Sequence, residues 1–139
     1  MFAVIRMRGV VKARKQAINT LKLLRLHRKM HCVVIPDNPS YKGMIQAAKD
    51  YITWGTISEN VLQMMVTKRG RKPGNVRLNA DEANRAIAML KEGKKPEIVP
   101  VFRLTPPRGG FKHSIKHSYP RGEIGNRKDK INELLEKMI

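Results

Sequence analysis

The sequence predicts an α+β protein with a β-α-β-α-β unit over residues 1–57 and a helical, basic extension over residues 58–139. Short runs rich in β-branched residues alternate with segments whose apolar residues recur at helical spacing. Turn residues separate these segments. Apolar residues make up 41% of the chain and aromatic residues only 5%, so its modest core must consist mainly of Ile, Leu, Val and Met.

The first unit begins with the run 2–7, which predicts a strand because alternate residues would face opposite sides of a sheet. Phe2, Val4 and, less clearly, Arg6 would share one face, and Ala3, Ile5 and Met7 the other. Segment 13–29 predicts a helix whose apolar face includes Ala17, Leu21 and Leu24. The β-branched run 31–35 predicts a second strand. Ser40 can cap a helix over 41–50, and residues 51–54 predict a third strand.

The extension contains three further helical patterns. One begins at Ser58 and has Val61, Leu62, Met65 and Val66 as its apolar side; the others cover 81–92, capped by Asn79, and 128–138. Residues 98–104 predict a short extended run. Residues 105–126 are rich in Pro, Gly, Lys, Arg and His without periodicity, so they predict a basic loop that a partner must order.

Charge is the strongest global property of the chain. Lys and Arg total 29 and Asp and Glu 11, which leaves a net charge of +18. No acidic residue precedes Asp37, and Glu123 is the only one between Arg103 and Lys128. A body with this charge repels itself, and a polyanion relieves the repulsion by displacing its own counterions. The composition therefore predicts a nucleic-acid partner, with an anionic membrane surface as the alternative.

Targeting and redox features are sparse. Cys32 is the single cysteine, so it excludes an internal disulfide and is predicted to be a buried small hydrophobe in a reducing compartment. The first residues lack the apolar stretch of a signal peptide, and no run approaches the roughly 20 apolar residues of a membrane span.

Two sets of residues resemble the ribosomal protein thirty family of the large subunit. They are Thr20, Leu21, Leu24, Leu26, Arg28, His31 and Val33, followed by the Lys42-Gly43-Met44-Ile45 turn with Ala48, Tyr51 and Ile52. Segments 51–55, 68–70, 107–110 and 125–132 resemble the long form of that family, which occurs in archaea and, as ribosomal protein seven, in eukaryotes. Because the chain starts directly at the first strand, without the basic extension of the eukaryotic members, the archaeal version is expected.

The resemblance implies a fold and a function. The fold is a three-stranded sheet of order 3-1-2, related to ferredoxin-like folds, with two helices on one face and antiparallel neighbours. A simple β-α-β crossover would instead suggest that strands one and two are parallel. The implied function is a structural, non-enzymatic part of the cytoplasmic large subunit, which binds its rRNA and supports assembly and translation. 5S rRNA and neighbouring ribosomal proteins are further expected partners; no cofactor, membrane or small-molecule substrate is expected.

Three basic regions are the candidate contacts: the turn after the first strand, the run 68–73 and the loop 106–113. In that loop the glycines allow close approach to phosphates, and Phe111 could either stack on a base or pack on the core. The predicted RNA-binding residues are Arg6, Arg8, Lys12, Arg14, Lys15, Lys42, Lys68, Arg69, Arg71, Lys72, Arg108, Gly109, Gly110, Phe111, Lys112, His113, Lys116, His117, Arg121 and Arg127.

Other functions receive less support. His113 and His117 stand four residues apart, but flanking lysines disfavour a metal ion, and no metal site is expected. A DNA-binding protein with two helices as a recognition pair is one alternative. A small RNA-processing enzyme is another, and it would need His113 or His117 for acid–base chemistry.

Overall fold

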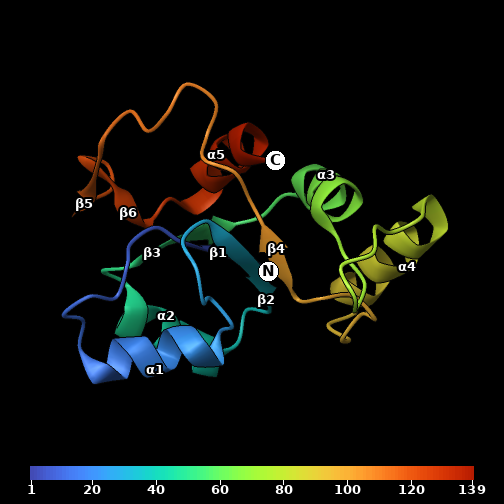
Figure 1. Cartoon of the computed structure of the whole chain (residues 1–139), viewed down its shortest axis with the longest axis horizontal. Helices are drawn as coiled ribbons and strands as arrows, with labels where there is room; N and C mark the ends of the chain where they lie inside the picture. The colour runs from blue at the N-terminus through green and yellow to red at the C-terminus, as the bar shows by residue number, and fades with distance from the viewer.

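The computed structural model describes residues 1–139 and contains one six-stranded mixed sheet of order β4-β2-β1-β3-β6-β5 (Figure 1). The strands are β1 (Phe2–Arg6), β2 (His31–Ile35), β3 (Ile52–Thr56), β4 (Val101–Arg103), β5 (Ser114–Ser118) and β6 (Gly122–Asn126). The helices are α1 (Lys15–Leu23), α2 (Pro39–Ala48), α3 (Glu59–Arg69), α4 (Ala80–Lys91) and α5 (Ile131–Met138), with a 3₁₀ turn at Lys128–Lys130.

Helices cover both faces of the sheet, because β1 has apolar residues on both sides. Val4 packs with residues of α1 and α2 in one cluster, whereas Ala3, Ile5 and Met7 pack with α3, α4 and α5 in another. Figure 1 shows α1 and α2 on the first face and α3 and α5 on the second. The face assignment predicted from the alternation in β1 is confirmed.

The strand directions agree with the resemblance. β1 is antiparallel to both β2 and β3, so the suggestion of parallel strands from a simple crossover was wrong. The irregular segments 7–14 and 24–30 on either side of α1 explain this difference. They give the chain enough length to return to the end of the sheet at which β1 finished.

The predicted three-stranded sheet is incomplete. The order 3-1-2 lies in the middle of the sheet, but β4 adds antiparallel to β2 and β6 adds parallel to β3. β5 lies outside β6, with an irregular register between them. The prediction of a structureless loop over 105–126 was therefore wrong for 114–118 and 122–126. β5 has four exposed residues, so it shows no apolar alternation.

Two helix boundaries also differ from the prediction. α1 ends at Leu23 rather than near residue 29, because Arg25 takes the left-handed conformation with φ 59°. α2 begins at Pro39, with Asn38 and not Ser40 at its N-cap, since proline is favoured in the first turn. The apolar side predicted for α3 is confirmed. The predicted units 1–57 and 58–139 share the sheet and one apolar cluster.

Cys32 is fully buried, and burial raises the pKa of its thiol to about 12. Because the thiolate is the reactive form, we expect the folded protein not to react with a disulfide reagent such as DTNB at pH 8. The same protein in denaturant should react completely, and absorbance of the released thiolate measures both. Rapid reaction under native conditions would contradict the burial of this thiol.

Candidate nucleic-acid interface

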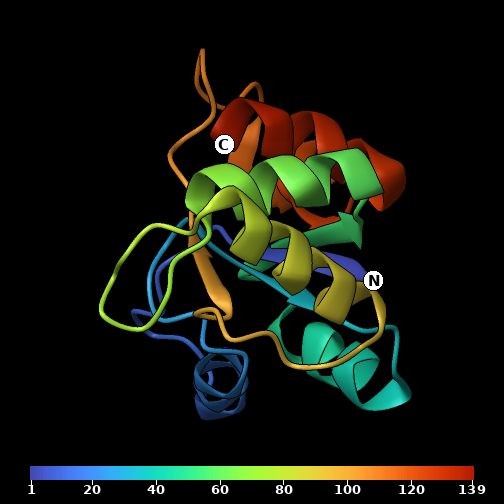
Figure 2. The ribbon, with the colours of Figure 1, turned by 90° about the vertical axis from the view of Figure 1, so that its right-hand side faces the viewer.

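Several connections leave the sheet at the same end. β1 and β4 finish where β2, β3 and β6 begin, as their registers require. The segments 7–14, 24–30, 49–51 and 104–113 therefore meet there, and we call this part of the molecule the loop end. It lies on the left of Figure 2, where the connection between α3 and α4 also projects. Asp50 is its only acidic residue.

The turn after β1 presents free cations at the loop end. Lys12, Arg14 and Lys15 are exposed, and none of them forms an ion pair. Arg8 is half-buried, with its guanidinium carbon 5.8 Å from the centre of the Tyr51 ring. These four side chains lie together as the sequence predicted, although RNA contact by them stays a prediction.

Arg6 has a structural role instead. Its side chain is only 7% exposed, and Nη1 donates to the carbonyl oxygens of Leu26 at 2.8 Å and His27 at 2.6 Å. Burial lowers the pKa of this guanidinium. The structure therefore places Arg6 inside the protein and not on the exposed surface where the prediction had it, while RNA contact itself stays untested. Arg6 thus uses its buried guanidinium to hold the connection between α1 and β2 through the Leu26 and His27 carbonyls.

The segment 105–126 exposes most of its predicted contact residues. Gly109 and Gly110 both take positive φ, 80° and 77°, which lets this loop turn without steric strain. The exposed side chains are Arg108, Lys112, His113, Lys116, His117 and Arg121. Phe111 is half-buried and packs against the apolar cluster that contains residues of α3 and α5. The sequence left open whether Phe111 stacks on a base or packs on the core, and in this structure it packs on the core.

Arg127 was predicted to contact RNA, but it is buried in an ion pair with Glu123. Its Nε donates to Thr53 Oγ1 at 3.1 Å. Glu123 also accepts a hydrogen bond from the backbone N–H of His113 at 3.0 Å. These contacts fasten β6 and the start of β5 to β3. Arg127 therefore positions the exposed basic segment and is not part of its surface.

The basic run after α3 forms a small hairpin in which Arg71 pairs with Arg77. Gly74 and Asn75 make its turn, with φ 86° and 65°. Lys68 and Arg77 are exposed without an ion pair, and Arg77 is a basic residue that the sequence analysis missed. Its proximity to Arg71 becomes visible only once Gly74-Asn75 is recognised as a hairpin turn.

Other predicted contacts are already engaged. Lys72 pairs with Glu82, and Arg69 donates to the Ile139 carbonyl at 2.8 Å. Lys42 lies at the opposite end of the sheet, on α2, and pairs with Asp37 at 2.6 Å. These three side chains are therefore less available to RNA than the cations that have no partner within the protein.

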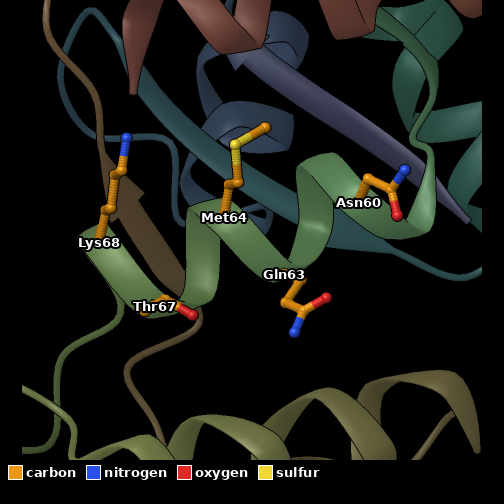
Figure 3. A pocket seen from close by; sticks show the side chains of 5 residues that line it. All are labelled: Asn60, Gln63, Met64, Thr67 and Lys68. Carbon is orange, nitrogen blue, oxygen red and sulfur yellow. The ribbon is translucent and has the colours of Figure 1, made fainter.

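A shallow hollow lies on the outer side of α3. It is lined by Asn60, Gln63, Met64, Thr67 and Lys68 (Figure 3). Gln63 and Thr67 point to the side on which α4 lies, whereas Met64 and Lys68 point away from it. The hollow has no titratable group except the Lys68 ammonium, and it offers no set of groups for acid–base chemistry.

Most of the positive charge is not neutralised within the protein. Against 29 Lys and Arg residues the structure has five ion pairs. It contains no group of three or more His, Cys, Asp or Glu residues arranged to hold a metal ion. No helix has both the length and the apolarity of a membrane span. Fold and surface together define a basic α+β protein whose surplus charge gathers in loops.

Comparison with known proteins gives the family. Residues 2–52 match the family model described as ribosomal protein L30p/L7e. The chain is 45% identical to the large ribosomal subunit protein uL30 of Archaeoglobus fulgidus, with 99% of each chain covered. It is 44% identical to that of Methanosphaera stadtmanae over all of both chains, and 43% identical to that of Staphylothermus marinus over 100% of this chain and 98% of the relative.

The chain therefore belongs to the uL30 family of ribosomal proteins. This confirms the resemblance stated from the sequence, including its long archaeal form. Members of this family are structural components, so the expectation that the chain is not an enzyme is also confirmed.

Proposed function

We propose that this protein is a structural constituent of the large ribosomal subunit in the cytoplasm, where it binds and stabilises large-subunit rRNA. Relatives that share nearly its whole length are named as proteins of that subunit. The observation that carries rRNA binding is the set of exposed, unpaired cations at the loop end and on segment 105–126. Their counterions are released when rRNA phosphates replace them, which favours binding.

The proposed contact residues are the members of the predicted set that the structure leaves available, together with Arg77. They are Arg8, Lys12, Arg14, Lys15, Lys68, Arg71, Arg77, Arg108, Gly109, Gly110, Lys112, His113, Lys116, His117 and Arg121. 5S rRNA and neighbouring large-subunit proteins are proposed as further partners. By holding RNA segments that meet at these loops, the protein would support subunit assembly and translation.

Sedimentation of cell extract through a sucrose gradient at low salt tests the location. The protein should travel with large subunits and with intact ribosomes. Its absence from all ribosomal particles, or its presence with small subunits alone, would contradict the proposal.

Replacing Arg108 and Lys112 together by alanine should weaken rRNA binding and reduce its dependence on salt. Each phosphate contact contributes about 0.7–0.9 to the slope of log K against log salt, so loss of two should lower the slope by about 1.4–1.8. Filter binding at several salt concentrations measures it.

The matched control is Lys91→Ala with Lys94→Ala, which removes the same charge from residues already paired with Glu59 and Glu92. This control should leave the slope nearly unchanged. An equal slope in all three proteins would exclude a phosphate role for Arg108 and Lys112.

A further inference from the structure

A row of basic side chains crosses three strands at the loop end. His31 on β2 is the register partner of Arg103 on β4. Because Ile5 pairs with Cys32 across β1 and β2, the next position of that register places Arg6 beside His31. Register partners project from the same side of a sheet. Arg6, His31 and Arg103 therefore lie side by side on the face that α1 and α2 cover further along the strands.

The neighbours that act electrostatically on His31 all disfavour a positive charge on its ring. The groups near enough to act on its ring are Arg103 on β4, Arg28 and His27 on the α1–β2 connection, and Arg6 on β1. After burial, these four groups are the causes that lower the pKa of His31. No carboxylate opposes them, and none of the three arginines forms an ion pair. The free protein thus holds an unneutralised cluster that a bound anion would stabilise.

The loop that carries Arg28 is fixed in place. Arg6 holds the carbonyls of Leu26 and His27, and the Met30 N–H donates to the Arg6 carbonyl at 2.8 Å. On the other side, the Leu104 N–H donates to the Met30 carbonyl at 3.1 Å. The connection is therefore bonded to both β1 and the end of β4. Such preorganisation lowers the ordering cost of binding.

The cluster is also open to a ligand. Arg28 and Arg103 are both exposed, so their guanidinium groups are available to an oxyanion, for which arginine is well suited. The Nδ1 atom of His31 is buried and has no hydrogen-bond partner. This nitrogen therefore gives the charged imidazolium no hydrogen bond within the free protein.

We propose that a backbone phosphate of RNA binds to Arg28 and Arg103 beside the His31 ring, and that its binding is coupled to uptake of a proton by His31. The inference rests on the proposed function, because the phosphate belongs to the bound rRNA. It adds a site and a pH dependence that the proposed function does not require.

The sign of the pH dependence follows from the charges. Cations lower the pKa of His31 in the free protein, and a phosphate beside the ring raises it in the complex. Between these two pKa values the complex holds more protons than the free protein, so affinity falls as pH rises. One coupled proton limits the change to about tenfold per pH unit. Below the lower pKa and above the higher one, this contribution is constant.

The test is the affinity of the intact protein for a large-subunit rRNA transcript, measured from pH 5 to pH 8 at constant ionic strength. Wild-type affinity should fall as pH rises over this range. The affinity of His31→Gln should fall less over the same range. Arg103→Ala should weaken binding about tenfold at pH 6, as expected for loss of a charge-assisted hydrogen bond. Lys91→Ala with Lys94→Ala, which changes two exposed lysines already paired with Glu59 and Glu92, is the matched control and should keep the wild-type profile.

If His31→Gln does not fold, the double variant Arg28→Ala with Arg103→Ala tests the proposed phosphate site instead. It retains the histidine and changes only exposed side chains, and it should show a flattened pH profile. If the transcript binds wild type but both the His31 and the arginine variants keep its affinity and its pH profile, the phosphate site is excluded while the proposed function stands. If the wild-type protein does not bind the transcript, both the phosphate site and the proposed function are contradicted.

Discussion

Replacing Arg127 by methionine should lower the free energy of unfolding by about 3–5 kcal/mol, because it leaves the Glu123 carboxylate buried without its partner. Both side chains are less than one-tenth exposed. The change also removes the hydrogen bonds from the guanidinium to Thr53 and to the Glu123 carbonyl. Urea denaturation followed by circular dichroism measures the loss.

Two further variants identify the cause of this loss. Lys42→Met breaks an ion pair with Asp37 in which both side chains are more than half exposed, so it should cost at most about 1 kcal/mol. Glu123→Leu combined with Arg127→Met removes both buried charges and should recover part of the stability. If Arg127→Met cost no more than Lys42→Met, the buried pair would not anchor segment 105–126.

Gly55→Ala should destabilise the protein by about 3 kcal/mol, the upper part of the range for an overpacked core. A Cβ at Gly55 would lie 2.1 Å from the Lys128 carbonyl oxygen and 2.8 Å from the Ile131 Cβ. The first of these atoms belongs to the backbone, so α5 would have to move away from β3. That movement would disturb the buried side chains of α5, which are Ile131, Leu134, Leu135 and Met138.

Gly43→Ala is the control for this substitution. Gly43 lies within α2, and a Cβ there would meet nothing within 4 Å. Alanine is favoured over glycine in a helix, so this change should stabilise the protein by about 0.5–1 kcal/mol. Thermal unfolding should therefore shift in opposite directions for the two glycines. A Gly55→Ala protein as stable as wild type would contradict the close contact between β3 and α5.

The local elements were largely predictable from the sequence, because their signals are local. Alternation in residues 2–7 identified both faces of β1, and the spacing of Val61, Leu62, Met65 and Val66 identified the buried side of α3. β5 and β6 were missed because distant contacts stabilise them. Arg127, for example, is bonded to Thr53, which is 74 positions earlier in the chain.

The sequence predicted that the candidate interface is positively charged, but it did not predict which basic residues form it. Composition shows that many cations lack acidic partners, whereas only the fold shows which ones are engaged. Arg6 and Arg127 are buried, while Arg77 and Arg103 are exposed, and no local pattern separates the two groups. His31 could be placed beside Arg103 only after β4 was paired with β2.

The central position of β1 has a consequence during synthesis of the protein. One face of β1 is covered by α1 and α2, which leave the ribosome soon after it. The other face, with Ala3, Ile5 and Met7, is covered by α3, α4 and α5, and the last of these helices is formed by residues 131–138. A nascent chain that has only its first three strands therefore exposes an apolar sheet face to water, and chaperone binding should be strongest until α5 emerges.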